Sequence, residues 1–443
     1  MSGSQRPVWF IVAVVLGLAA VGYLALRPGP SALPTPSARP TAAPLAVAPT
    51  AAAPTAGPPA PLAPAPTAAR PVAQNAPAVF GPSLLNSTSG PEDWAMEGNN
   101  PSRTRAIEAQ LVLPLSQQRE VRLTADTGDG SPLTIARGTM LVESDHLLRA
   151  FDMRDAKERW SFPLRGIYVS PAVAGKYVFI RSESDNKGQM LALDIDSGKT
   201  LWAFTPKRLS SAANSYFGGH LTSPVVVGGV IFVGAGKEVY ALDATTGAVR
   251  WEFDAEEYVS SSPTVSDGRV YISDFTSFYA IDQATGAKLW SYPTTMTLYF
   301  APVIGGRTAL ISSGNQLVAL DTASGQPRWS ISLPGDGIIP GAIQGTRAFV
   351  KSTSTLYALD LASGQQLWQA HDLNYVSLPA VAGDQVFVIS GMGVDTTLSA
   401  LDASTGRDTW KLPVRSLATT PPVIAGQSLY VRTTDGRVLG FWH

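Results

Sequence analysis

The stretch VYALDATTGAVRWEF, residues 239–253, places an alanine, an aspartate, a glycine and a tryptophan at fixed offsets. The aspartate and the tryptophan stand eight positions apart, and seven copies of this spacing occur along the chain: Asp152/Trp160, Asp194/Trp202, Asp243/Trp251, Asp282/Trp290, Asp321/Trp329, Asp360/Trp368 and Asp402/Trp410. The copies recur about every 40 residues, a period typical of repeat architectures. A catalytic residue, in contrast, is normally unique in its chain. The copies therefore predict a structural unit and no active site.

A glycine follows the aspartate by four positions in six copies, namely Gly198, Gly247, Gly286, Gly325, Gly364 and Gly406, while Ala156 takes that place in the first. The aspartate can accept hydrogen bonds from the amides that follow it, and glycine can adopt the positive φ of a tight hairpin. An alanine stands two positions before every aspartate. We expect the tryptophan of an adjacent repeat unit to fill the space beside this small residue.

A proline followed by a short apolar run marks the start of eight units, at Pro132, Pro171, Pro224, Pro263, Pro302, Pro340, Pro379 and Pro422. Each unit reads as four short β-rich segments separated by Gly, Ser, Asp and Thr turns. The pattern predicts an all-β fold, an eight-bladed β-propeller with four-stranded antiparallel blades. The last unit contains only three such segments, so we expect REVRLTA at 119–125 to supply the fourth strand and close the ring.

The first 92 residues differ in composition from the repeats. Residues 8–26 are uncharged and mostly apolar, long enough to cross a bilayer, and predict a transmembrane signal anchor, with a cleaved signal peptide as the alternative. Residues 1–7 would be a cytoplasmic N-terminus, and the Pro/Ala/Thr-rich residues 27–92 a disordered linker. The propeller, residues 93–443, would then lie outside the cytoplasm of a single-pass cell-membrane protein, in the periplasm or the extracellular space.

The composition excludes several classes of function. The formal net charge of −1 gives no general attraction for nucleic acid. The chain has no cysteine, so it has no disulfide, thiolate metal site or cysteine nucleophile. Its four histidines show no metal-ligand spacing.

The pattern A-x-D-x-x-T/S-G-x-x-x-W closely resembles the tryptophan-docking repeat of the pyrroloquinoline quinone (PQQ) propeller superfamily. That superfamily includes quinoprotein alcohol dehydrogenases and a smaller, non-catalytic group of outer-membrane (BamB-like) assembly factors. The stretch DWAMEGNNPSRT, residues 93–104, is similar to the segment that precedes the propeller in the smaller members. The resemblance spans about 93–443 and implies the fold more specifically than the function.

The resemblance implies that an enzyme of this superfamily would need a stacked quinone, a calcium site of acidic and amide side chains, and an aspartate base. This set cannot be placed on the sequence. We therefore predict no catalytic residues, no metal site and no cofactor, and interpret the chain as a non-catalytic scaffold with a protein partner at the cell envelope. A small quinoprotein oxidoreductase that uses PQQ with calcium, and a glycan- or wall-binding module, are the alternatives.

The units differ in length at 181–190, 203–223 and 390–398, in connections that emerge on one face of a propeller. Variable loops on a rigid scaffold are where binding specificity normally lies. Aromatic residues and one histidine also gather before the first strands, and they are the partner-binding candidates: Tyr168, Tyr216, Phe217, His220, Tyr258, Tyr299 and Tyr375. The charged residues of these loops, Arg181 and Lys207 among them, are expected to be solvated.

Overall fold

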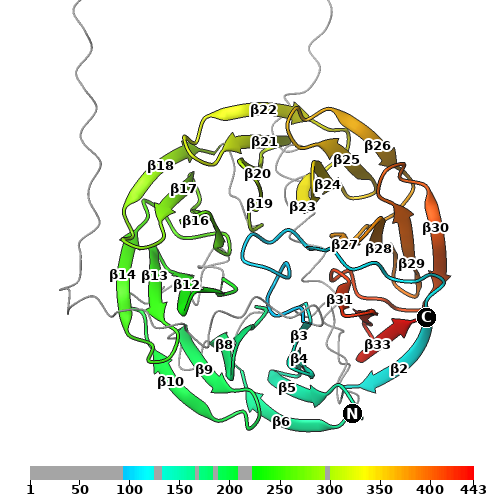
Figure 1. Cartoon of the computed structure of the whole chain (residues 1–443), viewed down its shortest axis with the longest axis horizontal. Coiled ribbons are helices and arrows are strands. Elements are labelled where there is room, and N and C mark those ends of the chain that lie inside the picture. Colours follow the sequence, from blue (N-terminus) through cyan, green and yellow to red (C-terminus); the bar gives the residue numbers. More distant parts are fainter. Residues whose placement is uncertain (1–92, 124–131, 165–168, 183–187, 208–221, 295–299) are drawn as a thin grey trace, which may run out of the picture. The chain divides into compact units, whose positions relative to one another are not determined.

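The computed structural model describes residues 93–123, 132–164, 169–182, 188–207, 222–294 and 300–443. These residues form eight β-sheets that follow one another as the blades of a ring (Figure 1). The predicted all-β, eight-bladed propeller is therefore confirmed. The predicted N-terminal tail, membrane span and linker, 1–92, lie outside the described residues. Within the described ranges, no helix has the length and apolar character needed to cross a membrane.

The first four blades are continuous in sequence. Blade 1 contains β3 (Thr134–Ala136), β4 (Thr139–Ser144), β5 (Leu147–Asp152) and β6 (Glu158–Pro163), and blade 2 contains β7 (Ala172–Ala174), β8 (Tyr177–Ser182), β9 (Gln189–Asp194) and β10 (Thr200–Phe204). Blade 3 contains β11 (Val225–Val227), β12 (Val230–Ala235), β13 (Glu238–Asp243) and β14 (Val249–Asp254), and blade 4 contains β15 (Thr264–Ser266), β16 (Arg269–Ser273), β17 (Ser277–Asp282) and β18 (Lys288–Pro293).

The remaining blades include two strands from the N-terminal side of the repeats. Blade 5 contains β19 (Val303–Gly305), β20 (Thr308–Ser313), β21 (Gln316–Asp321) and β22 (Pro327–Ser332), and blade 6 contains β23 (Ile339–Gln344), β24 (Arg347–Lys351), β25 (Leu356–Asp360) and β26 (Gln366–Ala370). Blade 7 contains β27 (Ala380–Ala382), β28 (Gln385–Met392), β29 (Asp395–Asp402) and β30 (Asp408–Pro413), with β1 (Ala106–Ile107) added in parallel to β27. Blade 8 contains β31 (Val423–Ala425), β32 (Ser428–Arg432), β33 (Arg437–Trp442) and β2 (Ser116–Arg122), and β2 pairs antiparallel with β33.

Each blade runs from a short first strand beside the central channel to a fourth strand at the rim, where β6, β10, β14 and β18 are seen in Figure 1. The connections between third and fourth strands carry the D-x-x-T/S-G sequence, and we call their side of the ring the turn face. The connections between second and third strands, and those between blades, emerge on the opposite side, which we call the variable face. The alternation of strand direction in an antiparallel blade separates these two kinds of loop.

The repeated aspartate and glycine build the hairpin on the turn face, as blade 3 illustrates. The Asp243 carboxylate accepts hydrogen bonds from the amides of Thr245 and Thr246, each at 3.0 Å. The Gly247 amide donates to the Asp243 carbonyl at 2.8 Å, and Gly247 has a φ of 72°. In blade 1 Ala156 adopts the same left-handed conformation, with a φ of 60°. The motif is therefore a turn that fixes where the fourth strand begins.

Six tryptophans link the successive blades from blade 1 to blade 7. The indole nitrogen of each donates to the carbonyl that follows the turn aspartate of the next blade: Trp160 to Ile195 (2.8 Å), Trp202 to Ala244 (3.1 Å), Trp251 to Gln283 (2.9 Å), Trp290 to Thr322 (3.1 Å), Trp329 to Leu361 (3.1 Å) and Trp368 to Ala403 (3.0 Å). The ring itself lies on the turn glycine, since a β-carbon at Gly247 would come within 2.6 Å of Trp202.

This contact corrects the expected packing beside the alanine of an adjacent blade. Ala241 lies opposite Trp251 of its own blade, and the tryptophan that reaches blade 3 covers Gly247 instead. The physical reason is that a glycine offers a flat surface without a β-carbon, on which an indole can rest directly. The alanine is the small cross-strand neighbour of the tryptophan in its own blade.

The docking series ends at blade 8. Trp410 faces that blade, whose third and fourth strands come from opposite ends of the repeats and so share no turn on which an indole could dock. At the next boundary, Arg119 of β2 lies opposite Gly440, at the position that tryptophan occupies in the other blades. Its guanidinium donates to the Arg154 carbonyl of blade 1 at 3.0 Å. At the boundary between the last and first blades, a polar contact from Arg119 therefore takes the place of the indole contact, beside an apolar core that the two blades share.

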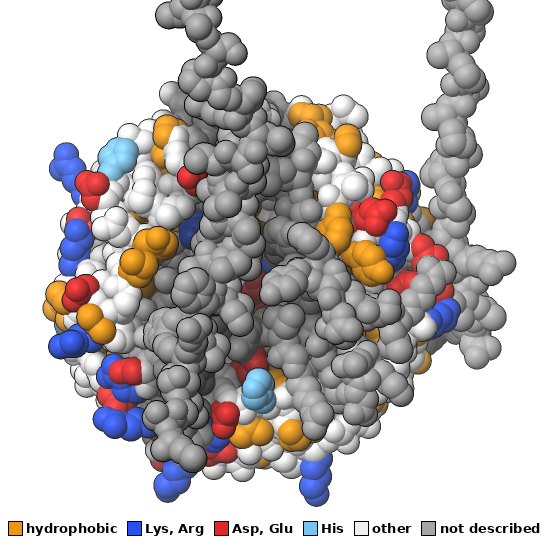
Figure 2. Space-filling model, turned by 180° about the vertical axis from the view of Figure 1, so that it is seen from behind, with side chains coloured by type: hydrophobic (Ala, Val, Ile, Leu, Met, Phe, Trp, Pro, Cys, Tyr) orange, Lys and Arg blue, Asp and Glu red, His pale blue; other side chains and the backbone are white. Residues whose placement is uncertain are grey.

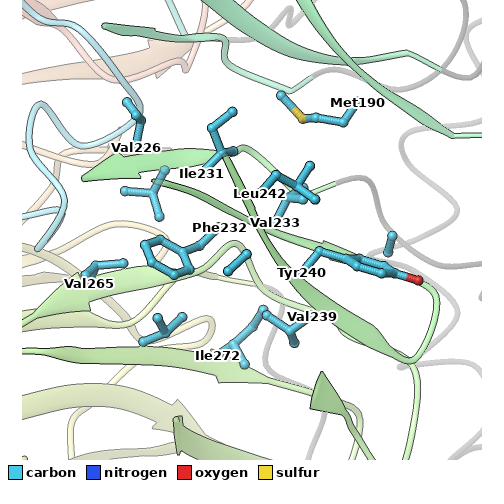
Figure 3. Close-up of a cluster of buried hydrophobic side chains, with 14 of the residues drawn as sticks. Met190, Val226, Ile231, Phe232, Val233, Val239, Tyr240, Leu242, Val265 and Ile272 are labelled. Carbon is cyan, nitrogen blue, oxygen red and sulfur yellow. The ribbon is translucent and has the colours of Figure 1, made fainter. Parts of the chain in front are cut away.

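The core lies between the faces of successive sheets. Figure 3 shows Met190 of blade 2 on the side of Ile231 and Leu242 of blade 3, and Val265 and Ile272 of blade 4 on the side of Phe232 and Val239. Phe232 and Tyr240 are fully buried. Each blade thus buries both of its faces against its neighbours.

The docking contact predicts a specific loss of stability for Gly247→Ala. The new β-carbon would collide with Trp202 and would also occupy a left-handed conformation, so we expect a loss of about 2–4 kcal/mol in the free energy of unfolding. Gly228→Ala is the control, because Gly228 has a φ of 56° and a β-carbon at that position would meet no atom within 4 Å. The control should cost about 1 kcal/mol. Urea denaturation followed by tryptophan fluorescence measures both. Equal losses would contradict the docking role.

The turn aspartates predict a loss of stability in acid. Burial raises the pKa of Asp243, but hydrogen bonds from Thr245, Arg250 and Thr246 outweigh it and bring the pKa to about 2. The other six turn aspartates also have lowered pKa values. Because the unfolded carboxyl titrates near pH 4, the stabilisation is complete above about pH 4 and is lost as the pH falls toward 2.

The substitution Asp243→Asn tests this pH dependence. It should lower the free energy of unfolding by about 1 kcal/mol at pH 7 and by less than half as much at pH 2, where about half of the native Asp243 carboxyl is protonated. Asp254→Asn, at an exposed position at the end of β14, is the control and should have little effect at either pH. An Asp243→Asn effect of the same size at pH 7 and pH 2 would refute the assignment.

Candidate functional site

The central channel is occupied by residues 93–107, which we call the channel segment. Its carbonyls accept hydrogen bonds from the middle of the first strands: Trp94 from Ile135 (3.0 Å), Ala95 from Val173 (2.8 Å), Pro101 from Val265 (2.8 Å), Ser102 from Ile304 (3.1 Å), Thr104 from Ile343 (2.9 Å) and Arg105 from Val381 (2.9 Å). These strands belong to blades 1, 2, 4, 5, 6 and 7. Figure 1 shows the segment in blue and cyan, crossing the centre of the ring.

The side chain of Arg103 connects the channel segment to blades 3 and 4. Its Nε donates to the Pro263 carbonyl at 2.9 Å and its Nη2 donates to the Ser223 carbonyl, just before β11 of blade 3, at 3.2 Å. Its Nη1 forms an ion pair of 2.9 Å with Glu97. Arg103 is 2% exposed, so its hydrogen bonds are made away from solvent. The residue is a structural link across the channel.

A second arginine lies beside the same carboxylate. Arg105 Nη2 is 3.5 Å from Glu97 Oε1, and the side chain of Arg105 is 7% exposed. Burial raises the pKa of Glu97, but Arg103 and Arg105 outweigh it and lower that pKa below its ordinary value. Burial also lowers the pKa of Arg105, and the Glu97 charge opposes this change. With Glu97 ionised, the three side chains carry a net charge of +1 inside the channel.

A small cavity adjoins these three side chains. It measures about 50 Å³ and is lined by Glu97, Arg103, Arg105, Ser262, Phe300, Ala301, Val303, Pro340 and Leu378. The lining residues outside the channel segment lie just before or at the start of the first strands of blades 4–7, so the cavity lies toward the variable face. Phe300 is 48% exposed and marks its edge.

The channel does not fit the quinone cofactor that the PQQ superfamily implies. Pockets that hold ligands of drug size enclose about 300–1,000 Å³, whereas this cavity encloses about 50 Å³ and the channel segment fills the space beside it. Among the described residues, no three His, Cys, Asp or Glu side chains come together in a group that could hold a metal ion. The described residues that line this cavity therefore do not fit PQQ with calcium.

The predicted partner-binding residues fall into two groups. Tyr168, Tyr216, Phe217, His220 and Tyr299 lie outside the described residues. Tyr258 and Tyr375 are described. Tyr258 is partly buried, with its ring 6.2 Å from that of Phe275 and Lys237 Nζ 5.5 Å from its centre. Tyr258 is therefore held by neighbours of its own blade and of blade 3.

Tyr375 belongs to an exposed apolar cluster on the variable face. Its side chain is 46% exposed, and Met392 and Val394 at the tip of the β28–β29 hairpin are 66% and 50% exposed. The Gly391 amide donates to the Asn374 carbonyl at 2.6 Å, which joins the loop of Tyr375 to the hairpin of Met392. We call Tyr375, Met392 and Val394 the blade 7 patch.

The loop that carries Tyr375 is fixed on both sides. On the blade 6 side, Leu373 and Val376 donate to the carbonyls of Ser354 and Thr353, each at 3.1 Å, and Lys351 Nζ donates to the Val376 carbonyl at 2.7 Å. Burial lowers the pKa of Lys351. A loop that is already fixed loses little backbone conformational entropy when it binds, which suits a partner contact.

Among the described charged residues of the variable loops, Arg181 differs from the expectation. Lys207 is exposed and pairs with Glu252 at 2.7 Å, as a solvated loop residue can. Arg181, in contrast, is 5% exposed and donates to the Gly234 carbonyl of blade 3 at 2.6 Å. The reason is that Arg181 still belongs to β8, at the buried interface between blades 2 and 3. Figure 2, which views the ring from the side opposite to Figure 1, shows acidic and basic side chains interspersed, with apolar groups between them.

Sequence reasoning misses both the residues of the channel and part of the blade 7 patch. The length variation marks residues 390–398 as variable, but a selection of aromatic side chains passes over Met392 and Val394. The signal is present, since two apolar residues alternate with Gly391 and Gly393 in an enlarged hairpin. Glu97, Arg103 and Arg105 precede the repeats, so no repeat spacing points to their position.

Solved structures with a similar fold include a BamB protein and dehydrogenases. BamB from Moraxella catarrhalis is 18% identical, with a TM-score of 0.56, and the match covers 74% of this chain and all of that one. Quinohemoprotein alcohol dehydrogenase from Comamonas testosteroni is 14% identical, with a TM-score of 0.65, over 79% of this chain and 80% of that one. A europium-containing methanol dehydrogenase is 14% identical, with a TM-score of 0.61, over 80% and 98%. At these identities the likeness shows the fold alone.

A match to a curated protein covers a shorter stretch. The serine/threonine-protein kinase AfsK of Streptomyces griseus is 32% identical over 140 residues, which are 30% of this chain and 16% of the kinase. The family model for the outer membrane protein assembly factor BamB matches residues 83–218, 205–337, 279–375 and 352–442, which together span nearly the whole propeller. The chain therefore belongs to the family of the outer membrane protein assembly factor BamB, and its eight blades are built from the PQQ-like repeat.

Proposed function

We propose that this protein is a non-catalytic, membrane-anchored scaffold that binds a protein partner at the cell envelope, in the assembly of envelope or outer-membrane proteins. The observation that carries the proposal is the blade 7 patch. Its three apolar side chains are 46–66% exposed, and its loop is held by hydrogen bonds to blade 6 and to the β28–β29 hairpin. Membership of the BamB family supports a role in assembly.

The two other functions considered from the sequence have weaker support. An oxidoreductase needs space for PQQ and calcium, and the described channel offers a cavity of only about 50 Å³. A glycan-binding module would use exposed aromatic rings as stacking surfaces, but the described aromatic residues of the blade 7 patch contribute one ring, that of Tyr375. A protein partner fits the mixture of Tyr, Met and Val better, since aromatic and methionine side chains are enriched at such interfaces.

The proposal includes the location of the propeller. Residues 8–26 would anchor the chain in the membrane, residues 27–92 would form a flexible linker, and the propeller would lie outside the cytoplasm. It also includes closure of the ring, with β2 acting as the fourth strand of blade 8 through its pairing with β33. This pairing would leave the propeller rigid while the linker allows it to reach a partner away from the membrane.

Site-specific photocrosslinking in the native membrane tests the partner surface. A photoreactive residue in place of Met392 should capture one specific envelope protein, and Tyr375→Ser should reduce that capture at least tenfold, because truncation of a tyrosine that acts as a binding hot spot costs about 2 kcal/mol or more. The matched control is the same probe at Ala284, an exposed residue on the turn face. Equal capture at both positions, or no effect of Tyr375→Ser, would contradict the proposal.

Fractionation of cells tests the anchor separately. Deletion of residues 8–26 should move the protein from the membrane to the soluble fraction, because this is the apolar stretch long enough to cross the bilayer. Replacement of the same residues with an unrelated apolar span of equal length should restore membrane attachment. Persistent membrane association of the deletion variant after alkaline extraction would show that 8–26 is not the anchor.

A further inference from the structure

The channel cavity holds an arginine whose hydrogen-bonding capacity is largely unused. A guanidinium has five N–H donors, and burial of such a group without partners is costly. The side chain of Arg105 is 7% exposed, and among the described residues its polar contact is the ion pair with Glu97 at 3.5 Å. Arg105 lines the cavity directly. Its remaining donors are therefore available to a group that enters from the variable face.

Arg103 is different, although it lies beside the same carboxylate. Its donors reach three carbonyls, those of Pro263, Glu97 and Ser223, in addition to the Glu97 carboxylate. Arg103 also takes the nearer position to Glu97, with an ion-pair distance of 2.9 Å. Glu97 thus pairs mainly with Arg103. The positive charge of Arg105 is therefore only partly compensated by the Glu97 carboxylate.

The cavity has the size and the surroundings of a site for one small anionic group. A single water molecule needs about 10–15 Å³ of such space, so the 50 Å³ cavity could hold a group of about three heavy atoms. Apart from the charged cluster and Ser262, its walls are apolar, formed among others by Phe300, Ala301 and Leu378. A guanidinium binds a carboxylate through two parallel hydrogen bonds, and the planar carboxylate matches both the space and the net charge of +1.

We propose that this cavity binds a single carboxylate group through Arg105, with Glu97 as an internal competitor that weakens the binding. The carboxylate could be carried by a free small acid or by the C-terminus of a peptide, since the chemistry at Arg105 is the same. The site does not depend on the blade 7 patch or on the function proposed above, because every residue that forms it comes from the channel segment or from the mouth of the channel.

The proposal is tested with acetate, observed by saturation-transfer NMR on the full-length protein in a buffer without other carboxylates. Acetate should bind saturably. Arg105→Gln should abolish the binding, and Glu97→Gln should strengthen it at least tenfold, because the competing negative charge is removed while both arginines remain. A variant that fails to strengthen binding after the loss of Glu97 would contradict the proposed competition.

Ala301→Leu is the variant that leaves the charges unchanged. The larger side chain would fill the cavity and should abolish acetate binding with Glu97, Arg103 and Arg105 intact, so the test remains decisive if Arg105→Gln does not fold. Arg122→Gln, on β2 with its side chain 83% exposed, is the control for a general loss of positive charge and should leave binding unchanged. Saturable binding that survives both Arg105→Gln and Ala301→Leu, or no saturable binding in the native protein, would overturn the proposal.

The source of the carboxylate is distinguished with N-acetylglycylglycine and its C-terminal amide. Binding of the acid at least tenfold tighter than acetate, with no binding of the amide, would assign the site to the end of a peptide. Binding of acetate with exclusion of the dipeptide would assign it to a free small acid. Binding of the amide with the same affinity as the acid would show that the carboxylate is not recognised and would refute the proposal.

Discussion

The structure depends on hydrogen bonds between the channel segment and the inner edges of the blades. A ring of sheets leaves the first strand of every blade with backbone N–H groups that face the channel, and a buried donor without a partner costs about 1–3 kcal/mol. Carbonyls of Trp94, Ala95 and Thr104, together with three others of the segment, accept hydrogen bonds from six of these strands. Because one continuous stretch of chain satisfies successive blades, its course is fixed by the ring, and the side chains that it carries are fixed as well.

At the outer side of the ring, the indole contacts set the register of each blade on the next. A tryptophan such as Trp202 needs both the bare surface of Gly247 and the carbonyl of Ala244, so the turn face can vary little without loss of docking. The variable face has no such requirement. Its loops are free to differ in length, as the eight-residue strands β28 and β29 illustrate. The division between a constant and a variable face follows from where the docking contacts lie.

Much of the fold could be predicted because its determinants repeat. The Asp–Trp spacing predicts the blades, and the turn geometry at Asp243 and Gly247 follows from the ordinary chemistry of these residues. The predicted partner of the indole is wrong, since spacing within one unit cannot tell which residue of the next unit it meets. The channel site is beyond sequence reasoning for a related reason: Glu97 and Arg105 meet Ser262 and Phe300 only after the ring has closed around them.

At the two candidate sites the backbone adopts left-handed conformations at residues other than glycine. The channel segment holds Asn99, Arg103 and Arg105 at φ values of 71°, 54° and 51°, and the loop of the blade 7 patch holds Asp372, Asn374 and Tyr375 at 62°, 31° and 53°. Such conformations cost about 1–3 kcal/mol for residues other than glycine. The repeated turns meet the same demand with glycine in six of seven copies. Glycine at positions 105 and 375 would relieve the strain, but it would remove the guanidinium from the cavity and the exposed ring from the variable face.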